Sequence, residues 1–369
     1  MLNRRLSARS GREQSYFERT EMTRNNKLLI ATLGVLAAIL ACIKVYQSRR
    51  AGASLEPIVL YCVLPHPYFS GVMQGAEAYE REHGVRVRLV TGQESSQANV
   101  NQNVESLFTL GHRAFAIYPV DPAGSRGLFD RLKRAGCHVV AYGAQPEPGS
   151  AAAFAIATDT RAAATLAAES LVKLIGGRGR ILNVLESLTD ANTPIRDAAV
   201  REVVAKYPDV EIIQTIGDVT TEQKAREKIE SALVARGDEV DGIVCTGYTT
   251  TVAAAMLLSE RHARPGAKRI RFVGLDTDER VLAAIRDGSI DMTLAQNPFG
   301  HGYISCTLLG LLLEGWEPKA PYQFIDSGSV PVTKENLDTF EAGIREMTRT
   351  IVAELKMKYL NPPNALESE

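Results

Sequence analysis

From Pro57 onward the sequence alternates between short apolar runs and longer amphipathic stretches. The first apolar run covers residues 58–64, and the first amphipathic stretch covers residues 69–83 and stops before Gly84. Short apolar runs are typical of strands buried on both faces, and amphipathic stretches are typical of the helices that cover them. The alternation therefore predicts an α/β fold built on parallel sheets.

The alternation falls into two series separated by the Pro/Gly-rich loop 145–149. In the first series we expect strands and helices at residues 58–64, 69–83, 85–90, 97–110, 114–118, 124–135 and 138–142. In the second series we expect them at residues 154–157, 161–175, 180–185, 193–206, 210–216, 221–235, 242–246, 250–261, 270–275, 279–286, 290–294 and 300–313. A long final helix is expected over residues 335–358.

Together the two series have the length of two doubly wound domains of about 120 residues each. The sequence thus predicts two Rossmann-like lobes side by side. In open α/β sheets, ligands bind at the carboxyl ends of the strands. We therefore expect a ligand cleft between the lobes.

The sequence has no positive signal for an enzyme, a metal or a cofactor. The glycines at 176–179 follow a predicted helix, whereas a phosphate-binding loop follows a strand. No nucleophile elbow is present, and the six histidines and five cysteines lack metal-site spacing. A formal net charge of -1 gives no general attraction to nucleic acid.

Polar side chains follow several predicted strands. Asp276 follows the strand that ends at Leu275, where it would either face the cleft or cap the next helix. Gln296 follows the strand 290–294 and can both donate and accept hydrogen bonds. Arg196 lies near a helix N-terminus, where the dipole disfavours a cation, and this misfit favours a ligand contact.

Two aromatic residues follow the first strand. Tyr68 and Phe69 come directly after Pro67. Their rings would either stack on the apolar face of a sugar or pack in the mouth of the cleft.

The N-terminal part contains one apolar run, residues 28–43, preceded by the basic segment 23–27. A run of this length is short for a spanning helix and fits the apolar region of a secretory signal. The polar segment 1–27 lacks periodicity. One hypothesis is that translation starts at Met22, within this segment. Residues 44–56 are expected to form a tether.

The apolar run ends in Leu40-Ala-Cys42, which resembles a bacterial lipoprotein cleavage site, although Leu40 is larger than the usual residue. Lipidation of Cys42 is one interpretation. The alternatives are an uncleaved anchor, with Lys44 reaching the membrane interface, and a cleaved soluble form.

Several motifs, in order, resemble periplasmic sugar-binding proteins of the ribose-binding type, which are related to the ligand-binding part of lactose-repressor-family regulators. The resemblance covers about 280 residues and rests on segments that contain Leu64-Pro-His-Pro-Tyr-Phe69, Gln74-Gly-Ala-Glu-Ala78, Tyr118-Pro-Val-Asp121, Arg196-Asp-Ala-Ala199, Val273-Gly-Leu-Asp276, Ala295-Gln-Asn-Pro298 and Val332-Thr-Lys-Glu-Asn336.

The resemblance implies two lobes joined by three crossovers, near Ala157, Gln296 and Ile325. Lobe one would comprise residues 57–156 and 297–325, and lobe two residues 157–296 and 326–337. A C-terminal helix and tail would follow over residues 338–369. The family binds a sugar or similar small polar ligand and delivers it to an ABC-type importer in the cell envelope, so the expected partners are the ligand and the membrane subunits of an importer.

The resemblance also implies a set of ligand-binding residues. Arg196, Asp276, Gln296 and Phe69 match family pocket positions, and Tyr68 is a conservative change. The chain departs from the family at other positions, where it has His66, Gly143-Ala144, Gly247-Tyr248 and Val219. We expect His66, Tyr248 and Thr249 to reshape the site, so the usual ribose or pyranose contacts need not apply. The predicted ligand-binding set is His66, Tyr68, Phe69, Arg196, Tyr248, Asp276 and Gln296.

Other functions are also compatible with two such lobes. A sensory protein that signals to a membrane receptor or kinase would have the same sequence features. A DNA-binding regulator would need a helix-turn-helix before the lobes, where this chain has an apolar run. An enzyme with this fold is the remaining alternative.

Overall fold

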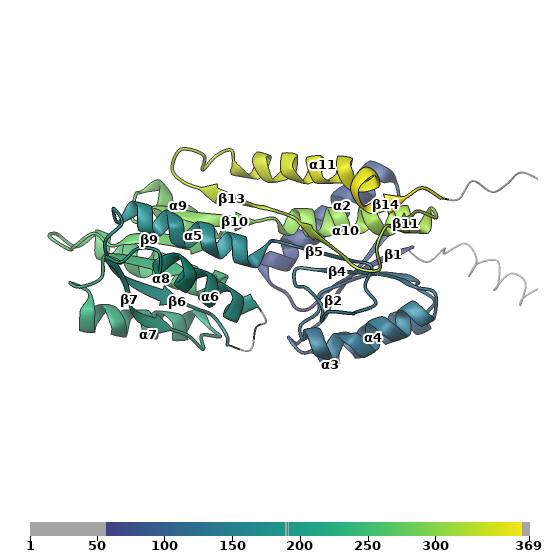
Figure 1. Ribbon diagram of the computed structural model, residues 1–369, viewed down its shortest axis with the longest axis horizontal. Coiled ribbons are helices and arrows are strands. Elements are labelled where there is room, and N and C mark those ends of the chain that lie inside the picture. Colours follow the sequence, from purple (N-terminus) through teal and green to yellow (C-terminus); the bar gives the residue numbers. More distant parts are fainter. Residues whose placement is uncertain (1–56, 189, 191, 364–369) are drawn as a thin grey trace, which may run out of the picture. The chain divides into compact units, whose positions relative to one another are not determined.

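The computed structural model describes residues 57–188, 190 and 192–363. Two six-stranded sheets form the centres of two lobes, which Figure 1 shows side by side. The predictions on residues 1–56, including the apolar run, the tether and lipidation of Cys42, lie outside the described residues.

The sheet of lobe one is parallel throughout and has the strand order β12-β5-β4-β3-β1-β2. Its strands are short and mostly apolar, and β1, β3 and β5 are buried at every residue. They are β1 (Ile58–Cys62), β2 (Val87–Thr91), β3 (Ala114–Ile117), β4 (His138–Tyr142), β5 (Phe154–Ala157) and β12 (Gln323–Asp326).

The sheet of lobe two repeats this arrangement with the order β13-β10-β9-β8-β6-β7. Only the edge strand β13 is antiparallel to its neighbour. The strands are β6 (Gly179–Val184), β7 (Val210–Ile216), β8 (Gly242–Cys245), β9 (Arg271–Leu275), β10 (Met292–Gln296) and β13 (Ser329–Val332).

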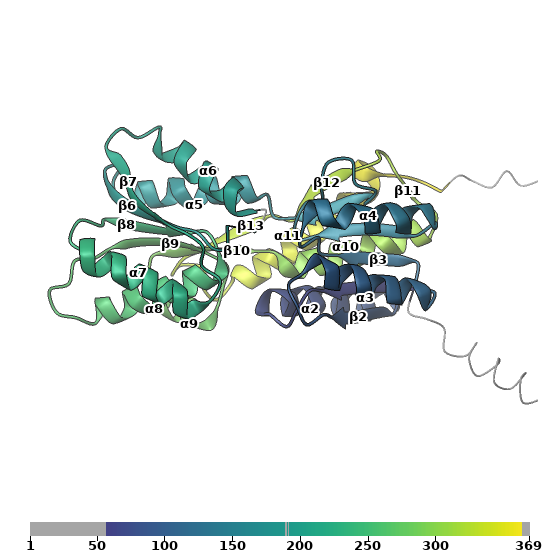
Figure 2. The same cartoon turned by 90° about the horizontal axis from the view of Figure 1, so that it is seen from below.

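Helices cover both faces of each sheet, so each lobe is doubly wound (Figures 1 and 2). Around lobe one lie α2 (Pro67–His83) and α10 (Pro298–Leu313) on one face, and α3 (Gln97–Thr109) and α4 (Pro122–Arg134) on the other. Around lobe two, the helices of one face are α5 (Thr160–Leu174) and α6 (Asn192–Val204), and those of the other are α7 (Glu222–Arg236), α8 (Tyr248–His262) and α9 (Glu279–Arg286).

The chain passes between the sheets at three connections: after β5, after β10, and between β12 and β13. The last helix, α11 (Phe340–Tyr359), then packs along α10. It leads into β14 (Leu360–Asn361), which pairs with β11 (Glu317–Pro318).

The fold class predicted from the alternation is confirmed, although several predicted bounds were wrong: for example, β1 ends at Cys62 and β2 begins at Val87. Strand β10 ends at Gln296, two residues later than expected, so Gln296 belongs to the strand. Helix α11 begins at Phe340, because residues 335–339 form turns. The short strands β11 to β14 were not predicted.

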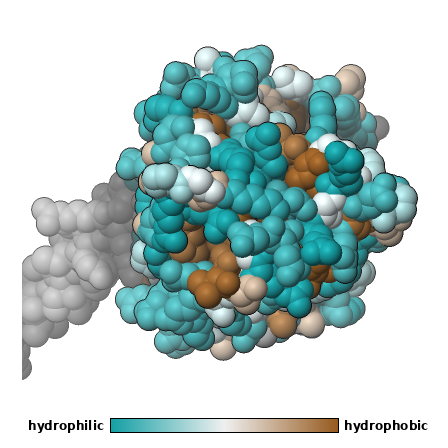
Figure 3. All heavy atoms as spheres, turned by 90° about the vertical axis from the view of Figure 1, so that its left-hand side faces the viewer, coloured by the Kyte–Doolittle hydropathy of each residue, from teal (hydrophilic) through white to brown (hydrophobic). Residues whose placement is uncertain are grey.

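Among the described residues, no helix combines the length and apolarity needed to cross a membrane. Figure 3 shows the end of lobe two as mostly hydrophilic, with apolar residues scattered over it. The described cysteines, Cys62, Cys137, Cys245 and Cys306, are buried and free.

Candidate functional site

A pocket of about 200 Å³ lies between the two lobes. Lobe one contributes mostly aromatic side chains, and lobe two contributes mostly charged and polar ones. The lining residues are Leu64, His66, Tyr68, Phe69, Tyr118, Gly143, Glu186, Asp190, Asn192, Arg196, Tyr248, Thr249, Asp276 and Gln296. The structure thus brings together all seven ligand-binding residues predicted from the sequence.

The wall from lobe one is a cluster of aromatic rings. Tyr68 and Phe69 lie in the first turn of α2, which begins at Pro67 with its φ already suited to a helix. Their rings meet edge to face at a centroid distance of 5.1 Å, and Tyr118 packs at 5.6 Å from Phe69 and 6.4 Å from Tyr68. Such mutual packing fixes the rings in one arrangement, so the wall is preformed.

His66 also belongs to the lobe-one wall of the pocket and is the N-cap of α2. Its Nδ1 accepts a hydrogen bond from the backbone N–H of Tyr68 at 3.2 Å. Burial lowers the pKa of His66 and outweighs the opposing effect of Glu186. The imidazole is therefore neutral at pH 7, in the state that can cap the helix.

Asp276 and Gln296 form the polar centre of the wall from lobe two. Nε2 of Gln296 donates to Oδ1 of Asp276 at 2.6 Å, and the two residues follow or end neighbouring strands. Asp276 has φ 72°, a left-handed conformation that is uncommon for a residue other than glycine. The cap of α9 is Asp278, so the alternative that Asp276 caps this helix was wrong.

Burial raises the pKa of Asp276 to about 6, although Gln296 and Arg196 both favour the charged form. A carboxylate held in this way has lost water without gaining a full set of partners. Strain and desolvation at one residue are typical of a binding position, where a ligand supplies the missing contacts.

Arg196 lies in the second turn of α6. Within the described part of the chain its guanidinium has no hydrogen-bond or ion-pair partner, although Asp276 and Tyr68 are close enough to be influenced by its charge. A guanidinium has five donors in a fixed plane. In this pocket those donors are available to a ligand.

Three polar residues of the pocket were missed by the sequence analysis: Glu186, Asp190 and Asn192. Oε1 of Glu186 accepts from the backbone N–H of Thr249 at 2.6 Å. It thereby caps α8, whose own N-cap, Gly247, has no side chain to do so. Glu186 follows strand β6 by two residues, so the position after a strand, which identified Asp276, was an available signal.

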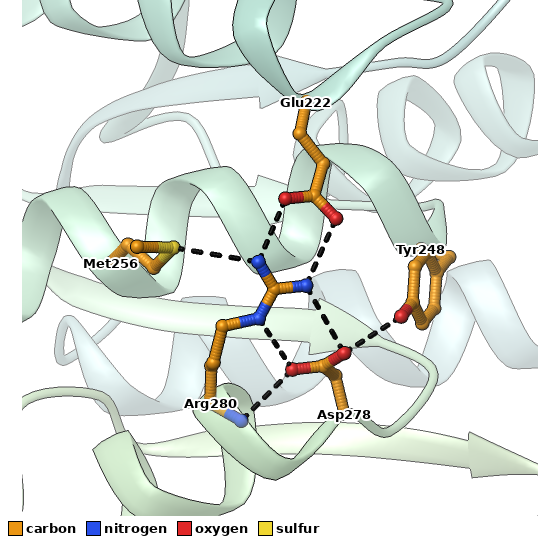
Figure 4. A network of polar contacts seen from close by, with 5 residues as sticks. All are labelled: Glu222, Tyr248, Met256, Asp278 and Arg280. Carbon is orange, nitrogen blue, oxygen red and sulfur yellow. Dashed lines mark hydrogen bonds and ion pairs between the residues drawn. The ribbon is translucent and has the colours of Figure 1, made fainter. Parts of the chain in front are cut away.

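Tyr248 is held from behind by a network of charged side chains (Figure 4). Its hydroxyl donates to Oδ2 of Asp278 at 2.7 Å, and Arg280 binds Asp278 on one side and Glu222 on the other. Hydrogen bonds from Arg280 and Tyr248 outweigh the effect of burial and lower the pKa of Asp278 to about 2. The orientation of Tyr248 is therefore fixed by an ionised carboxylate at neutral pH.

Three other positions named from the resemblance, Ala144, Gly247 and Val219, do not line the pocket, and Val219 lies in the core of lobe two. A larger cavity of about 610 Å³ adjoins the site and shares His66 and Gln296 with it. It extends from α2 to the first turns of α11, where Arg345 lies over the ring of Phe299. The smaller pocket contains the convergent polar groups, so we take it as the ligand site.

Two doubly wound lobes, three connections and a polar pocket between the lobes define a two-lobed solute receptor. The family model of the periplasmic binding protein domain matches the sequence over residues 58–317, and the chain belongs to this family.

Two relatives and one solved structure are similar to this chain over about three quarters of its length. A xylitol-binding protein of Mycolicibacterium smegmatis is 22% identical over 265 residues, which are 72% of this chain and 73% of the relative. A D-apiose import binding protein of Actinobacillus succinogenes is 24% identical over 274 residues, 73% of this chain and 84% of the relative. The crystal structure of an ABC transporter solute binding protein from Burkholderia graminis, in complex with D-arabinose, superposes with a TM-score of 0.70 at 23% identity and covers 76% of this chain and 96% of that one.

Proposed function

We propose that this protein is the solute-binding receptor of an ABC-type importer and that it binds a small uncharged sugar or polyol. The observation that carries the proposal is the division of the pocket between aromatic rings from lobe one and charged groups from lobe two. A sugar has both surfaces: its C–H face packs on rings, and its hydroxyls bind carboxylates and guanidinium groups. A ligand that contacts both walls favours the closed arrangement of the lobes.

The charges of the pocket narrow the class of ligand. Among the described residues, the lining contains the carboxyl groups of Glu186, Asp190 and Asp276 but only one side chain that is always cationic, Arg196. Carboxylates accept hydrogen bonds from hydroxyls and repel anions. We therefore expect neutral polyols to bind and sugar phosphates and sugar acids to be excluded.

Calorimetry on the purified chain tests the proposal. The panel comprises xylitol, D-apiose, D-arabinose and D-ribose, with D-ribose 5-phosphate and D-ribonate as the anionic comparison. We expect at least one neutral compound to bind and both anions to fail. Binding of none of the neutral compounds at millimolar concentration would contradict the proposal, and so would preferential binding of an anion.

A variant in the lobe-two wall separates pocket binding from nonspecific association. Arg196→Gln keeps a planar polar group but removes the charge and the bidentate geometry. We expect it to weaken binding by about tenfold or more, since hydrogen bonds to charged groups contribute about 1.5–3 kcal/mol. Arg161→Gln is the matched control, because Arg161 is an exposed arginine at the start of α5 that pairs with Glu202.

We further propose that the protein acts by binding and release without chemical change and that lipidation of Cys42 tethers it to the membrane. Product analysis of the calorimetry samples tests the first part, and any turnover would contradict it. Metabolic labelling with a fatty-acid analogue tests the second part. Label in the wild-type chain that is absent from Cys42→Ala supports the tether, and label in neither chain contradicts it.

A further inference from the structure

A chain of buried hydrogen bonds runs from the aromatic wall of the pocket to the connections between the lobes. The hydroxyl of Tyr68 lies 2.7 Å from Nδ1 of His301, and Nε2 of His301 lies 2.7 Å from Oγ of Ser327. His301 and Ser327 are completely buried. Tyr68 lines the pocket, whereas His301 and Ser327 do not.

Ser327 contacts all three connections. It belongs to the third, between β12 and β13. Its N–H donates at 2.9 Å to the carbonyl of Ala157, the last residue of β5, where the first connection begins. Its carbonyl accepts from Nδ2 of Asn297 in the second connection at 2.8 Å. Its Oγ also lies 3.4 Å from the hydroxyl of Thr158. Any change in the relative position of the three connections must therefore change the surroundings of Ser327.

The same residues are joined to α11. Asn297 caps α10 by accepting from the N–H of Gly300 at 2.6 Å, and its Nδ2 also lies 3.0 Å from the hydroxyl of Thr348. Asn297 and Thr348 are both buried. Buried polar groups that lose a partner are costly, so these bonds hold one arrangement of the connections.

The direction of the hydrogen bonds follows from counting protons. The Thr158 hydroxyl donates to the carbonyl of Gly328 at 3.2 Å, so Ser327 must donate in the bond between the two hydroxyls. Ser327 then accepts from Nε2–H of His301, and Nδ1 of His301 accepts from Tyr68. The proton of the Tyr68 hydroxyl is thus used inside the protein, and its oxygen can only accept a further hydrogen bond. Burial lowers the pKa of His301 to about 3, which keeps this imidazole neutral.

We propose that His301 is a positioning residue for ligand binding, because it holds Tyr68 in the pocket wall and links that wall, through Ser327, to all three connections between the lobes. The binding part of this inference rests on the proposed function. The direction of the hydrogen bonds can be measured without a ligand.

Deleting the hydroxyl groups at the two ends of this series of hydrogen bonds, Tyr68 and Ser327, tests whether His301 connects the pocket wall to the connections between the lobes. Tyr68→Phe and Ser327→Ala each remove one oxygen and leave the backbone contacts in place. With xylitol and D-arabinose as probes, we expect each variant to weaken binding by about threefold to tenfold, the loss of one neutral hydrogen bond. Because both act through His301, Ser327→Ala should have no further effect in the Tyr68→Phe background. Independent, multiplicative effects would overturn the proposal.

Tyr303→Phe is the matched control. Tyr303 lies two residues after His301 on the same helix, and its hydroxyl donates to Glu82, away from the pocket. We expect this deletion to lower the free energy of unfolding and to leave the affinity unchanged. Equal loss of affinity in Tyr303→Phe and Ser327→Ala would show a general effect of weakened packing and overturn the proposal.

A measurement without ligand keeps the two proposals distinct. Nitrogen NMR of the full-length chain labelled with ¹⁵N at histidine, with His301→Gln for assignment, reports which ring nitrogen carries the proton. We expect His301 to be protonated at Nε2 and not to titrate between about pH 5 and 8. Protonation at Nδ1, or titration in that range, would overturn the proposed direction of the hydrogen bonds through His301. Failure of every sugar to bind, with this signal as expected, would instead contradict the proposed function.

Discussion

The rings of His66 and Tyr248 meet edge to face, with their centroids 4.9 Å apart and their planes inclined by 70°. His66 caps the first helix of lobe one, and Tyr248 is the first residue of α8 in lobe two. The contact therefore joins the two lobes directly at the rim of the pocket. Because His66 is neutral at pH 7, the attraction comes from packing and ring geometry.

This contact leads to a prediction for Tyr248. Tyr248→Ala removes the ring, so we expect it to weaken sugar binding by more than about tenfold. Tyr248→Phe keeps the ring and loses only the bond to Asp278, so the loss should be smaller, about twofold to tenfold. Calorimetry with the ligand found in the panel measures both. Equal losses in the two variants would show that the hydroxyl, and not the ring across the cleft, is the important group.

The raised pKa of Asp276 predicts a pH dependence of folding. The unfolded value is near 3.8 and the folded value about 6, so the native state binds more protons between these two values. The free energy of unfolding should therefore fall as the pH rises from about 4 to about 6 and change little through this group above that range. Denaturant titrations across that range measure it.

Asp276→Asn is the variant that isolates this effect. Asparagine tolerates φ 72°, whereas Asp276→Ala would add backbone strain. We expect Asn to remove the slope and to be as stable as wild type, or more stable, at pH 7. Binding should show the opposite trend: wild-type affinity for a polyol rises between about pH 5 and 7, because the carboxylate is the better acceptor. A variant that keeps the full slope would assign the titration to another group.

The elements buried in the sheets could be predicted from the sequence because burial on both faces leaves a continuous apolar run. Strands β4, β5 and β7 were predicted to the residue. The short edge strands β12 and β13 could not be predicted from the sequence, because polar residues interrupt them and pairing across the sheet defines them. The start of α11 at Phe340 depends on turns stabilised by Asn336, which the periodicity does not report.

The pocket could be predicted only in part, for a related reason. Asp276 and Gln296 follow from their places at strand ends, whereas Glu186 was overlooked at a similar place. Tyr118 was noted only as part of a motif, and its role appears when the rings of α2 pack against it. The hydrogen bonds of His301 join it to Tyr68, 233 positions away in the sequence, and to Ser327, 26 positions away. Such contacts arise from the tertiary fold and leave no local pattern.

Glu186 gives a prediction that separates charge from structure. Glu186→Gln keeps an oxygen that can accept from the N–H of Thr249, whereas Glu186→Ala leaves α8 without its cap. We expect Gln to change stability little and Ala to cost about 1 kcal/mol of unfolding free energy, the usual contribution of a cap. If the excess of carboxylates excludes anions, Glu186→Gln should improve binding of a sugar acid relative to its neutral parent. Unchanged selectivity would remove Glu186 from that role.

Gly143 follows β4 with φ +75°, close to the aromatic wall of the pocket. A Cβ at this position would lie 2.4 Å from the Tyr68 hydroxyl oxygen and 2.6 Å from Cδ2 of Tyr118. Gly143→Ala must therefore displace the aromatic wall as well as strain the backbone. Gly84 is the matched control, because it has φ +69° and no atom within 4 Å of the added Cβ.

Both alanine variants should lose about 1–2 kcal/mol of stability from the left-handed backbone. Only Gly143→Ala should also weaken sugar binding, by about tenfold or more, because it moves the Tyr68 hydroxyl away from His301. In Tyr68→Phe the hydroxyl that the new Cβ meets is absent, so part of the penalty of Gly143→Ala should be relieved in the double variant. Denaturant unfolding and calorimetry of the four proteins measure this. If Gly84→Ala weakened binding as much as Gly143→Ala, backbone strain alone would explain the loss, and the contact between Gly143 and Tyr68 would have no special role in the site.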